Sequence, residues 1–174
     1  MVTTAITNMD VHDIARAART YGVKRFYIVT PLASQRELVE KILRHWQEGY
    51  GSYFNPSRRE AFQVAQIKNT LEEVVEDIAC APGKRLRIAA TGASLSRELI
   101  TFKAFRAVIR KSDDPHLLLF GTGWGIAEEA LGRADFFLEP IKGVGDYNHL
   151  SVRSAVSVAL DRLWGRGRDD NQMN

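Results

Sequence analysis

The sequence predicts an α/β fold with a mostly parallel sheet flanked by helices, and two observations predict it. Short, continuous apolar runs such as residues 26–29 and 117–120 are typical of strands that are buried on both faces. Longer segments with the helical period lie between these runs, and this alternation is typical of parallel strands joined by crossover helices. No internal repeat or linker interrupts the 174 residues. We therefore expect one domain over residues 1–174, in which residues 165–174 form a polar, flexible tail.

The individual elements follow from the same two patterns. The expected strands are short apolar runs, at residues 26–29, 64–67, 86–90, 117–120 and 136–138. The expected helices carry apolar residues three or four positions apart, at residues 10–21, 34–47, 70–79, 96–110, 126–131 and 150–164. Asp10 or Asp13 is expected to cap the first helix, and Gly22 to end it. The glycines around Gly51 and the Asn55-Pro56 pair predict a break in the helical pattern after the second helix.

The composition excludes several classes of protein. Cys80 is the only cysteine, which excludes an intrachain disulfide or a zinc site built from cysteines and fits a reducing compartment. No apolar run approaches the roughly 20 residues that a membrane helix needs. Asp10, Asp13 and Arg16 interrupt the N-terminal region, so we expect no signal peptide. We therefore expect a cytoplasmic protein without a membrane partner.

The formal charge of +3 is small, but it is unevenly distributed. Residues 1–60 carry nine Lys and Arg against six Asp and Glu, while the rest of the chain is balanced. Arginines outnumber lysines 17 to 7, and the guanidinium fork suits phosphate. This distribution is compatible with an acidic partner near the N-terminal third. On the charge distribution alone, an ordinary solvated surface explains it better.

Two loops follow predicted strands, where ligands bind in open α/β sheets. The first is the glycine-rich turn at residues 121–125, and the second is the polar stretch at residues 140–149. Glycines allow a ligand to approach the backbone closely, although a tight turn alone also needs them. A dinucleotide fingerprint does not fit the spacing. Asp135 comes only 14 residues after Gly121 and precedes its strand, whereas the fingerprint needs an acid about 20 residues on at the end of the next strand.

Four segments together resemble the SPOUT, or α/β-knot, RNA methyltransferases. The glycine turn after the strand at 117–120 resembles the first element of their cofactor site, and Glu139-Pro140-Ile141-Lys142-Gly143 resembles the second. The segment at residues 149–155, HLSVRSA, resembles the third, which opens the last helix. Upstream, NMDVHDIARAARTYGV at residues 8–23 resembles the family's first motif, in which an Asn and an Arg flank a short helix. The resemblance covers nearly the whole chain.

The resemblance implies a C-terminal deep trefoil knot whose loops bind S-adenosylmethionine (SAM). It assigns the cofactor contacts to the glycine turn and to the two later motifs. The implied cofactor residues are Gly121, Thr122, Gly123, Trp124, Gly125, Ile141, Leu150, Ser151 and Val152. It also implies a homodimer, and the strongly apolar helix at residues 150–164 fits a dimer interface as well as burial within one subunit.

The resemblance implies methyl transfer to a nucleotide of tRNA or rRNA. The motif arginine falls on Arg16 or Arg19, and the candidate bases are Asp146 and His149. The implied substrate contacts are Asn8, Tyr147, Asn148 and Arg153. Together with Arg25, Arg58 and Arg59, the two motif candidates are expected to form a phosphate-binding surface whose RNA affinity depends on salt.

The motifs depart from the family's pattern at several positions. Gly123-Trp124 stand in place of a Glu, Ser151 replaces an Asn, and Arg153 replaces a Ser. Only seven residues precede Asn8, where the family has a strand. These departures leave an alternative, a catalytically silent member that binds RNA or SAM. No metal is expected, because Asp10, His12 and Asp13 lack a fourth ligand and favour helix capping.

Overall fold

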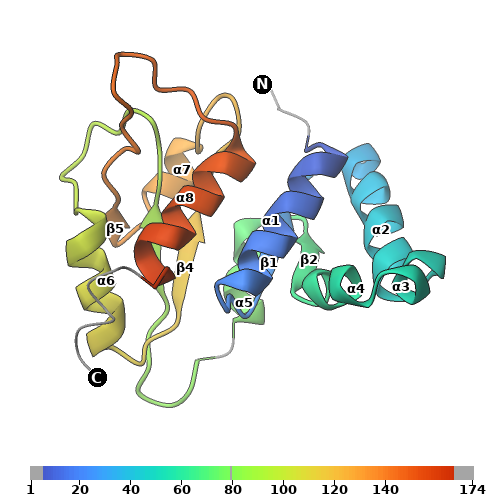
Figure 1. Cartoon of the computed structure of the whole chain (residues 1–174). Coiled ribbons are helices and arrows are strands. Elements are labelled where there is room, and N and C mark those ends of the chain that lie inside the picture. The colour runs from blue at the N-terminus through green and yellow to red at the C-terminus, as the bar shows by residue number, and fades with distance from the viewer. Residues whose placement is uncertain (1–5, 79, 167–174) are drawn as a thin grey trace. The chain divides into compact units, whose positions relative to one another are not determined.

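The computed structural model describes residues 6–78 and 80–166 (Figure 1). Its internal contacts group into two compact units, Met1–Ala79 and Cys80–Asn174. Each unit has its own parallel sheet and its own apolar core. The expected parallel strands and helices are therefore confirmed, but the strands form two sheets rather than one. The expectation of a single domain over the whole chain stays a prediction.

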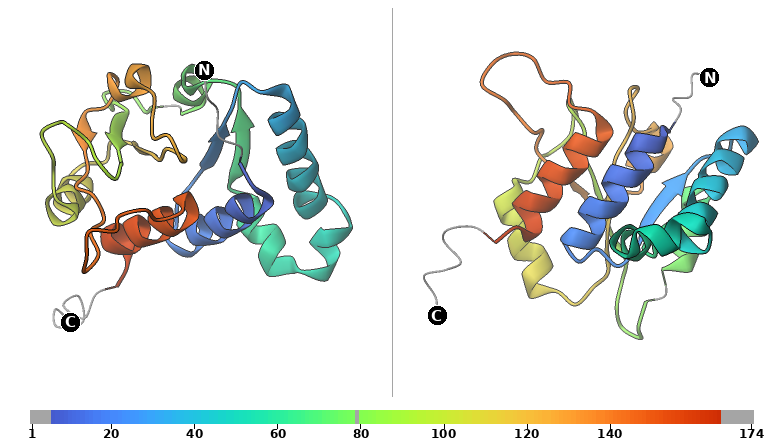
Figure 2. Two further views of the ribbon diagram at one scale, coloured as in Figure 1. Left: turned by 90° about the horizontal axis from the view of Figure 1, so that it is seen from above. Right: turned by 45° about the vertical axis from the view of Figure 1, so that its right-hand side comes forward.

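The first unit contains a two-stranded sheet. Its elements are α1 (Asn8–Thr20), β1 (Phe26–Val29), α2 (Ala33–Gln47), α3 (Tyr50–Phe54), α4 (Pro56–Phe62), β2 (Ala65–Lys68) and α5 (Leu71–Asp77). β1 and β2 pair in parallel, with Ile28 opposite Ile67. Figure 2 shows α1 and α5 on opposite sides of this pair of strands. The core joins α1, α2, α4 and β1 through buried side chains such as Val11, Val39 and Phe62.

The first helix begins two residues earlier than the sequence predicts. Its N-cap is Thr7, whose hydroxyl accepts from the backbone N–H of Asp10 at 3.2 Å, while the Asp10 carboxylate accepts from the Thr7 N–H at 3.1 Å. This reciprocal pair satisfies two backbone donors that would otherwise have no partner. Asp10 thus completes the cap from inside the helix, and the expectation that Asp10 or Asp13 is itself the N-cap is wrong.

The region around Asn55-Pro56 was expected to break the helical pattern, and it contains two short helices instead. The side chain of Asn55 accepts from the backbone N–H of Arg58 at 3.0 Å, and Pro56 occupies the first turn of α4. Proline is favourable there because its missing N–H would have no partner in a first turn. The residue pair therefore starts a helix as well as ending the one before it.

The second unit contains a three-stranded sheet in the order β4-β3-β5, all parallel. Its elements are β3 (Arg87–Ala90), α6 (Phe102–Lys111), β4 (His116–Leu119), α7 (Glu128–Leu131), β5 (Phe136–Phe137) and α8 (Val152–Trp164). α6 packs against α8, and Phe105, Leu138 and Leu163 are fully or almost fully buried between these helices and the sheet. No helix in the described residues is both long enough and apolar enough to cross a membrane.

The helix expected at residues 96–110 begins only at Phe102. Just before it, the N–H of Ile100 donates to the carbonyl of Phe137 at 2.8 Å, and the carbonyl of Ile100 accepts from the N–H of Glu139 at 3.0 Å. Thr101 then caps α6 by accepting from the Ala104 N–H at 3.1 Å. The expectation for residues 96–101 is therefore wrong. Of these residues, Ile100 forms an isolated parallel bridge with Leu138, the residue after β5.

Candidate functional site

The glycine-rich turn after β4 is a tight, closed structure. The N–H of Gly125 donates to the carbonyl of Thr122 at 2.7 Å, and Gly125 has a φ of 81°, which favours glycine. A Cβ placed on Gly121 would lie 2.3 Å from the carbonyl carbon of Gly125, so only glycine fits there. The turn holds Trp124 outward, with 76% of its surface exposed. The sequence thus closes the turn and presents an aromatic ring to solvent.

Three loops leave the same edge of the second unit's sheet. The N–H and hydroxyl of Thr91 both donate to the carbonyl of Leu119, at 3.0 and 2.9 Å, which aligns the ends of β3 and β4. The N–H of Leu138 donates to the carbonyl of Ala90 at 2.9 Å and aligns β5 with them. The loops after Ala90, Leu119 and Leu138 therefore begin side by side, as ligand-binding loops do in this class of fold.

The long loop between β5 and α8 is not held by backbone hydrogen bonds among the described residues. Between Pro140 and Leu150, the described backbone makes no hydrogen bond to another backbone group in the described residues. The loop extends away from the strands (Figure 2). Asn148 ties it to the loop after β3, because its side-chain amide donates to the carbonyl of Ala93 at 3.2 Å. Backbone groups of such a loop are available to a ligand at this edge.

These features fit the expected cofactor. An adenine ring needs apolar contacts and backbone hydrogen bonds, and the loops offer exposed Trp124 and Leu150 beside the open backbone that contains Ile141. Ser151 is already engaged, since it caps α8 and its hydroxyl lies 2.9 Å from that of Ser154. We therefore expect Ser151 and Val152, in the first turn of α8, to meet a ligand through their backbone.

The predicted bases Asp146 and His149 and the substrate residues Tyr147 and Asn148 lie in this loop without forming a closed cluster. Asp146 and His149 are both exposed, and no contact between them is observed within the described residues. The Tyr147 and His149 rings lie 5.3 Å apart, edge to face. Arg153 is half-buried in the first turn of α8. The structure therefore brings the rings of Tyr147 and His149 together.

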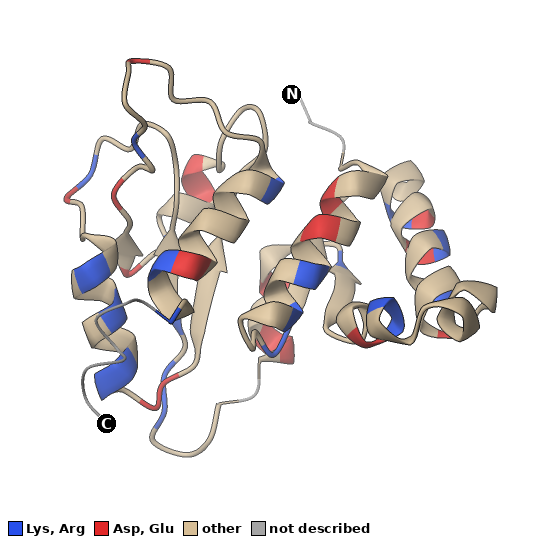
Figure 3. Ribbon diagram, in the orientation of Figure 1, with Lys and Arg blue, Asp and Glu red and all other residues tan. Residues whose placement is uncertain are grey.

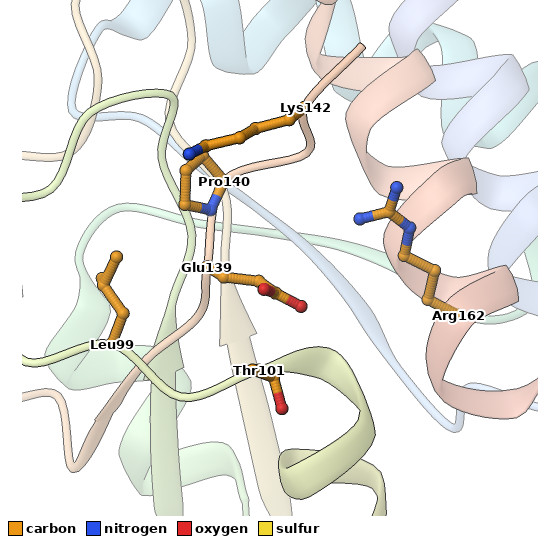
Figure 4. Close-up of a pocket in the computed structure, with 6 residues that line it drawn as sticks. All are labelled: Leu99, Thr101, Glu139, Pro140, Lys142 and Arg162. Atoms are coloured by element: carbon orange, nitrogen blue, oxygen red, sulfur yellow. The ribbon is translucent and has the colours of Figure 1, made fainter. Parts of the chain in front are cut away.

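A pocket of about 380 Å³ beside this loop was not predicted (Figure 4). Its lining residues are Leu99, Thr101, Glu139, Pro140, Lys142 and Arg162. Glu139 accepts from the backbone N–H of Phe102 at 2.9 Å, and the Arg162 guanidinium lies 5.1 Å from the centre of the Phe102 ring. None of the predicted cofactor residues lines it. Glu139 and Lys142 belong to the second motif, which was the only signal for this pocket in the sequence.

A second pocket, of about 320 Å³, belongs to the first unit, and we call it the arginine pocket. Arg16 and Arg19 of α1 line it together with Ser57, Arg58 and Glu60. Acidic residues occupy the first half of α1 and arginines its second half, as Figure 3 shows. Of the five arginines expected to form the phosphate-binding surface, Arg25 and Arg59 do not line this pocket. Asn8, a predicted substrate contact, lies exposed at the start of α1.

The two candidate motif arginines differ in what they contact. Arg19 donates through Nε to the Glu60 carboxylate at 2.9 Å, and a second guanidinium nitrogen contacts the same oxygen. Arg16 is exposed, and its guanidinium makes no ion pair with any described residue. An arginine without a carboxylate partner retains its full charge for a phosphate. The geometry therefore favours Arg16 as the motif arginine.

His12 lies next to the arginine pocket on α1. Its ring packs edge to face on Phe62 at 4.8 Å and on Trp46 at 5.3 Å. The pKa of His12 is lowered from 6.5, first by burial and then by the charge of Arg58, which lies 4.6 Å over the Trp46 ring. His12 is thus kept neutral beside a cluster of arginines.

We expect the stability of the protein to fall as the pH drops through about 6.5, because the unfolded chain then takes up a proton that folded His12 resists. His12→Phe keeps a ring and removes the titration, so its loss of stability between pH 7.5 and 5.5 should be smaller than that of the wild type. Urea unfolding at the two pH values measures this. Equal losses of stability in both proteins would contradict the assignment of this pH dependence to His12. A smaller loss of stability is still expected in His12→Phe, because burial also lowers the pKa of His116.

Comparison with known proteins gives the chain a family. The model of a family described as SAM-dependent RNA methyltransferase matches residues 1–165. An uncharacterized protein of Aquifex aeolicus (strain VF5) is 41% identical over 170 residues, which are 98% of this chain and 83% of the relative. A protein of Oleidesulfovibrio alaskensis named tRNA (guanine-N(1)-)-methyltransferase is 40% identical over 94% of this chain. The chain spans only 38% of that relative's length, so the named activity belongs to a protein whose larger part lies outside the match.

Solved structures show the same fold. The SpoU methyltransferase AviRb of Streptomyces viridochromogenes, in complex with the cofactor AdoMet, superimposes with a TM-score of 0.62 at 16% identity. The superposition covers 91% of this chain and 53% of that protein. Since the family model covers nearly the whole chain, the chain belongs to the SAM-dependent RNA methyltransferase family, which confirms the activity and the cofactor that its motifs led us to expect.

Proposed function

We propose that the chain methylates a nucleotide of tRNA, with the cofactor held at the open edge of the second unit's sheet. The observation that carries the proposal is the pair of loops at that edge. The turn at residues 121–125 is a tight turn that needs glycine, and the loop at residues 140–150 makes no backbone–backbone hydrogen bond among the described residues. The turn from Gly121 to Gly125 and the residues Ile141, Leu150, Ser151 and Val152 would hold the cofactor. When bound, SAM supplies an electrophilic methyl group. The Oleidesulfovibrio relative supports tRNA as the substrate.

The chain's own residues would bind and deprotonate the acceptor. The nucleotide's nitrogen or oxygen forms a bond to the methyl carbon as the carbon–sulfur bond breaks, and the acceptor's proton passes to a base. Asp146 and His149 are the exposed candidates for that base. Arg16 of α1 would hold a phosphate of the RNA. Tyr147, Asn148 and Arg153 would contact the nucleotide, and Asn8 of α1 would be a further contact with the RNA.

We also propose that the protein is a cytoplasmic homodimer whose C-terminal loops form a trefoil knot around the cofactor. Val152, Ala155 and Val158 on α8 are only half-buried, which leaves apolar surface for a partner. The likeness in fold to a SpoU methyltransferase supports the knot. Sedimentation of the purified protein tests the dimer.

Two measurements test the proposed function. Calorimetric titration with SAM should show binding at micromolar to millimolar concentrations. Incubation of the protein with labelled SAM and either bulk tRNA or bulk rRNA should transfer label to tRNA. No binding at millimolar SAM would overturn the proposal. SAM and RNA binding without any transfer would identify a catalytically silent member of the family, and transfer to rRNA alone would correct the substrate.

A further inference from the structure

The short helix α3 has an unusual distribution of side chains. Its three aromatic residues point to solvent, with exposed fractions of 71% for Tyr50, 81% for Tyr53 and 70% for Phe54, while Gly51 and Ser52 are buried. A five-residue helix that buries its small residues and exposes its aromatic rings reverses the normal preference. Exposed rings of this kind mark a binding surface.

The chain holds this arrangement rigidly. A Cβ on Gly51 would lie 2.6 Å from Nε2 of His45 and 2.9 Å from the Trp46 ring, so α3 lies against α2 as closely as a backbone can. The hydroxyl of Ser52 donates to the carbonyl of Gly49 at 2.7 Å. The Tyr50 and Phe54 rings lie 4.5 Å apart at an angle of 42°, so they already support one another. The exposed rings are therefore preorganised.

The rings are followed directly by the arginine pocket. Asn55 joins α3 to α4, and the side chains of Asn55, Ser57 and Arg58 line that pocket with Arg16. The acidic residue of this pocket, Glu60, is already paired with Arg19. The segment from Tyr50 to Arg58 thus presents aromatic faces and, next to them, the Arg58 guanidinium in the pocket that Arg16 also lines.

We infer that Tyr50, Tyr53 and Phe54 form a platform on which an unpaired base of the RNA stacks while its phosphate lies in the arginine pocket. This inference rests on the proposed function, because it takes RNA as the substrate. Aromatic side chains stack on bases of any sequence, and adjacent arginines hold the backbone. A second copy docked on this face with two-fold symmetry would bring arginines against arginines, whereas RNA complements their charge.

The test compares ring removal with ring retention. Binding of a fluorescent single-stranded RNA of about 12 nucleotides is measured by anisotropy, beside a duplex of the same length. Tyr53→Ala and Phe54→Ala should each weaken single-strand binding about tenfold, in line with the loss of one stacked base. Tyr53→Phe keeps the ring and should bind within twofold of the wild type. Leu38→Ala, which removes an exposed apolar side chain of α2, is the matched control and should change nothing.

Further measurements separate stacking from other roles. The rings carry no charge, so the alanine variants should lose the same factor at 50 and 200 mM salt and should bind the duplex as the wild type does. Unchanged single-strand affinity overturns the inference, and so does a shift from dimer to monomer with RNA affinity unchanged. If the wild type methylates tRNA and the alanine variants bind it normally, the platform is wrong and the proposed function stands. If single-strand binding depends on the rings but no RNA is methylated, the platform stands and the proposed function is wrong.

Discussion

Replacing Gly121 by alanine is expected to weaken binding of SAM about 10- to 100-fold. The added Cβ would lie 2.3 Å from the carbonyl carbon and 2.4 Å from the carbonyl oxygen of Gly125. Both are backbone atoms of the turn itself, so no flexible side chain can move aside, and the turn must open. Forced overpacking of this kind costs about 1–3 kcal/mol, and here it displaces the backbone that would contact the cofactor.

The measurement is calorimetric titration of the variant with SAM beside two comparisons. Gly132→Ala is the matched control, because its Cβ would meet the nearest carbonyl oxygens at an ordinary 3.5 Å at the end of α7. It should bind SAM as the wild type does. Gly125→Ala meets no atom within 4 Å but is strained by its φ of 81°, so its loss should be smaller than that of Gly121→Ala. Wild-type affinity in Gly121→Ala would contradict a cofactor role for the turn.

The strands were predictable because their signal is local. Residues 26–29 form β1 at the predicted positions, since a continuous apolar run between turn residues leaves few alternatives. The helix expected from residue 96 shows the limit of such a signal. Of its first six residues, Ile100 forms a parallel bridge with Leu138 just after β5, more than 30 residues later in the sequence. Helical periodicity does not reveal a pairing with a distant strand.

The segment from Tyr50 to Phe62 shows a different limit. Glycine, asparagine and proline were interpreted as breaks, which they are for a long helix, but Asn55 and Pro56 also start a short one. The burial of Gly51 against His45 and Trp46 depends on how α3 folds back on α2. The exposed aromatic face of α3 follows from that packing, and the sequence alone gave no reason to expect it.

The candidate site was predictable where it depends on neighbouring residues. The glycine turn and the start of the last helix within HLSVRSA arise from short motifs, and both are present. The choice between Arg16 and Arg19 depends on Glu60, which is 41 residues away from Arg19 in sequence. The pocket at Glu139 likewise depends on Arg162 of α8. These contacts are tertiary, so motif spacing left them open.

That difference between the two arginines leads to the second prediction. Arg16→Ala is expected to lower kcat/KM for methyl transfer to tRNA about 100-fold, the order of effect of losing one charged hydrogen-bond donor, and to leave the affinity for SAM unchanged. The structure shows Arg16 exposed in the arginine pocket without a carboxylate partner among the described residues. Arg16→Lys keeps the charge but loses the planar fork, so its activity should lie between those of Arg16→Ala and the wild type.

Arg19→Ala is the informative comparison, because the same pocket then loses a guanidinium that Glu60 already neutralises. An exposed ion pair contributes little to folding, so the variant should fold and keep activity within a few-fold of the wild type. Arg25→Ala, outside the pocket, controls for the loss of one positive charge. A larger effect of Arg19→Ala than of Arg16→Ala would make Arg19 the motif arginine. Full activity in both variants and in the double variant Arg16→Ala/Arg19→Ala would exclude the arginines of the first motif from the reaction, because α1 contains no other arginine.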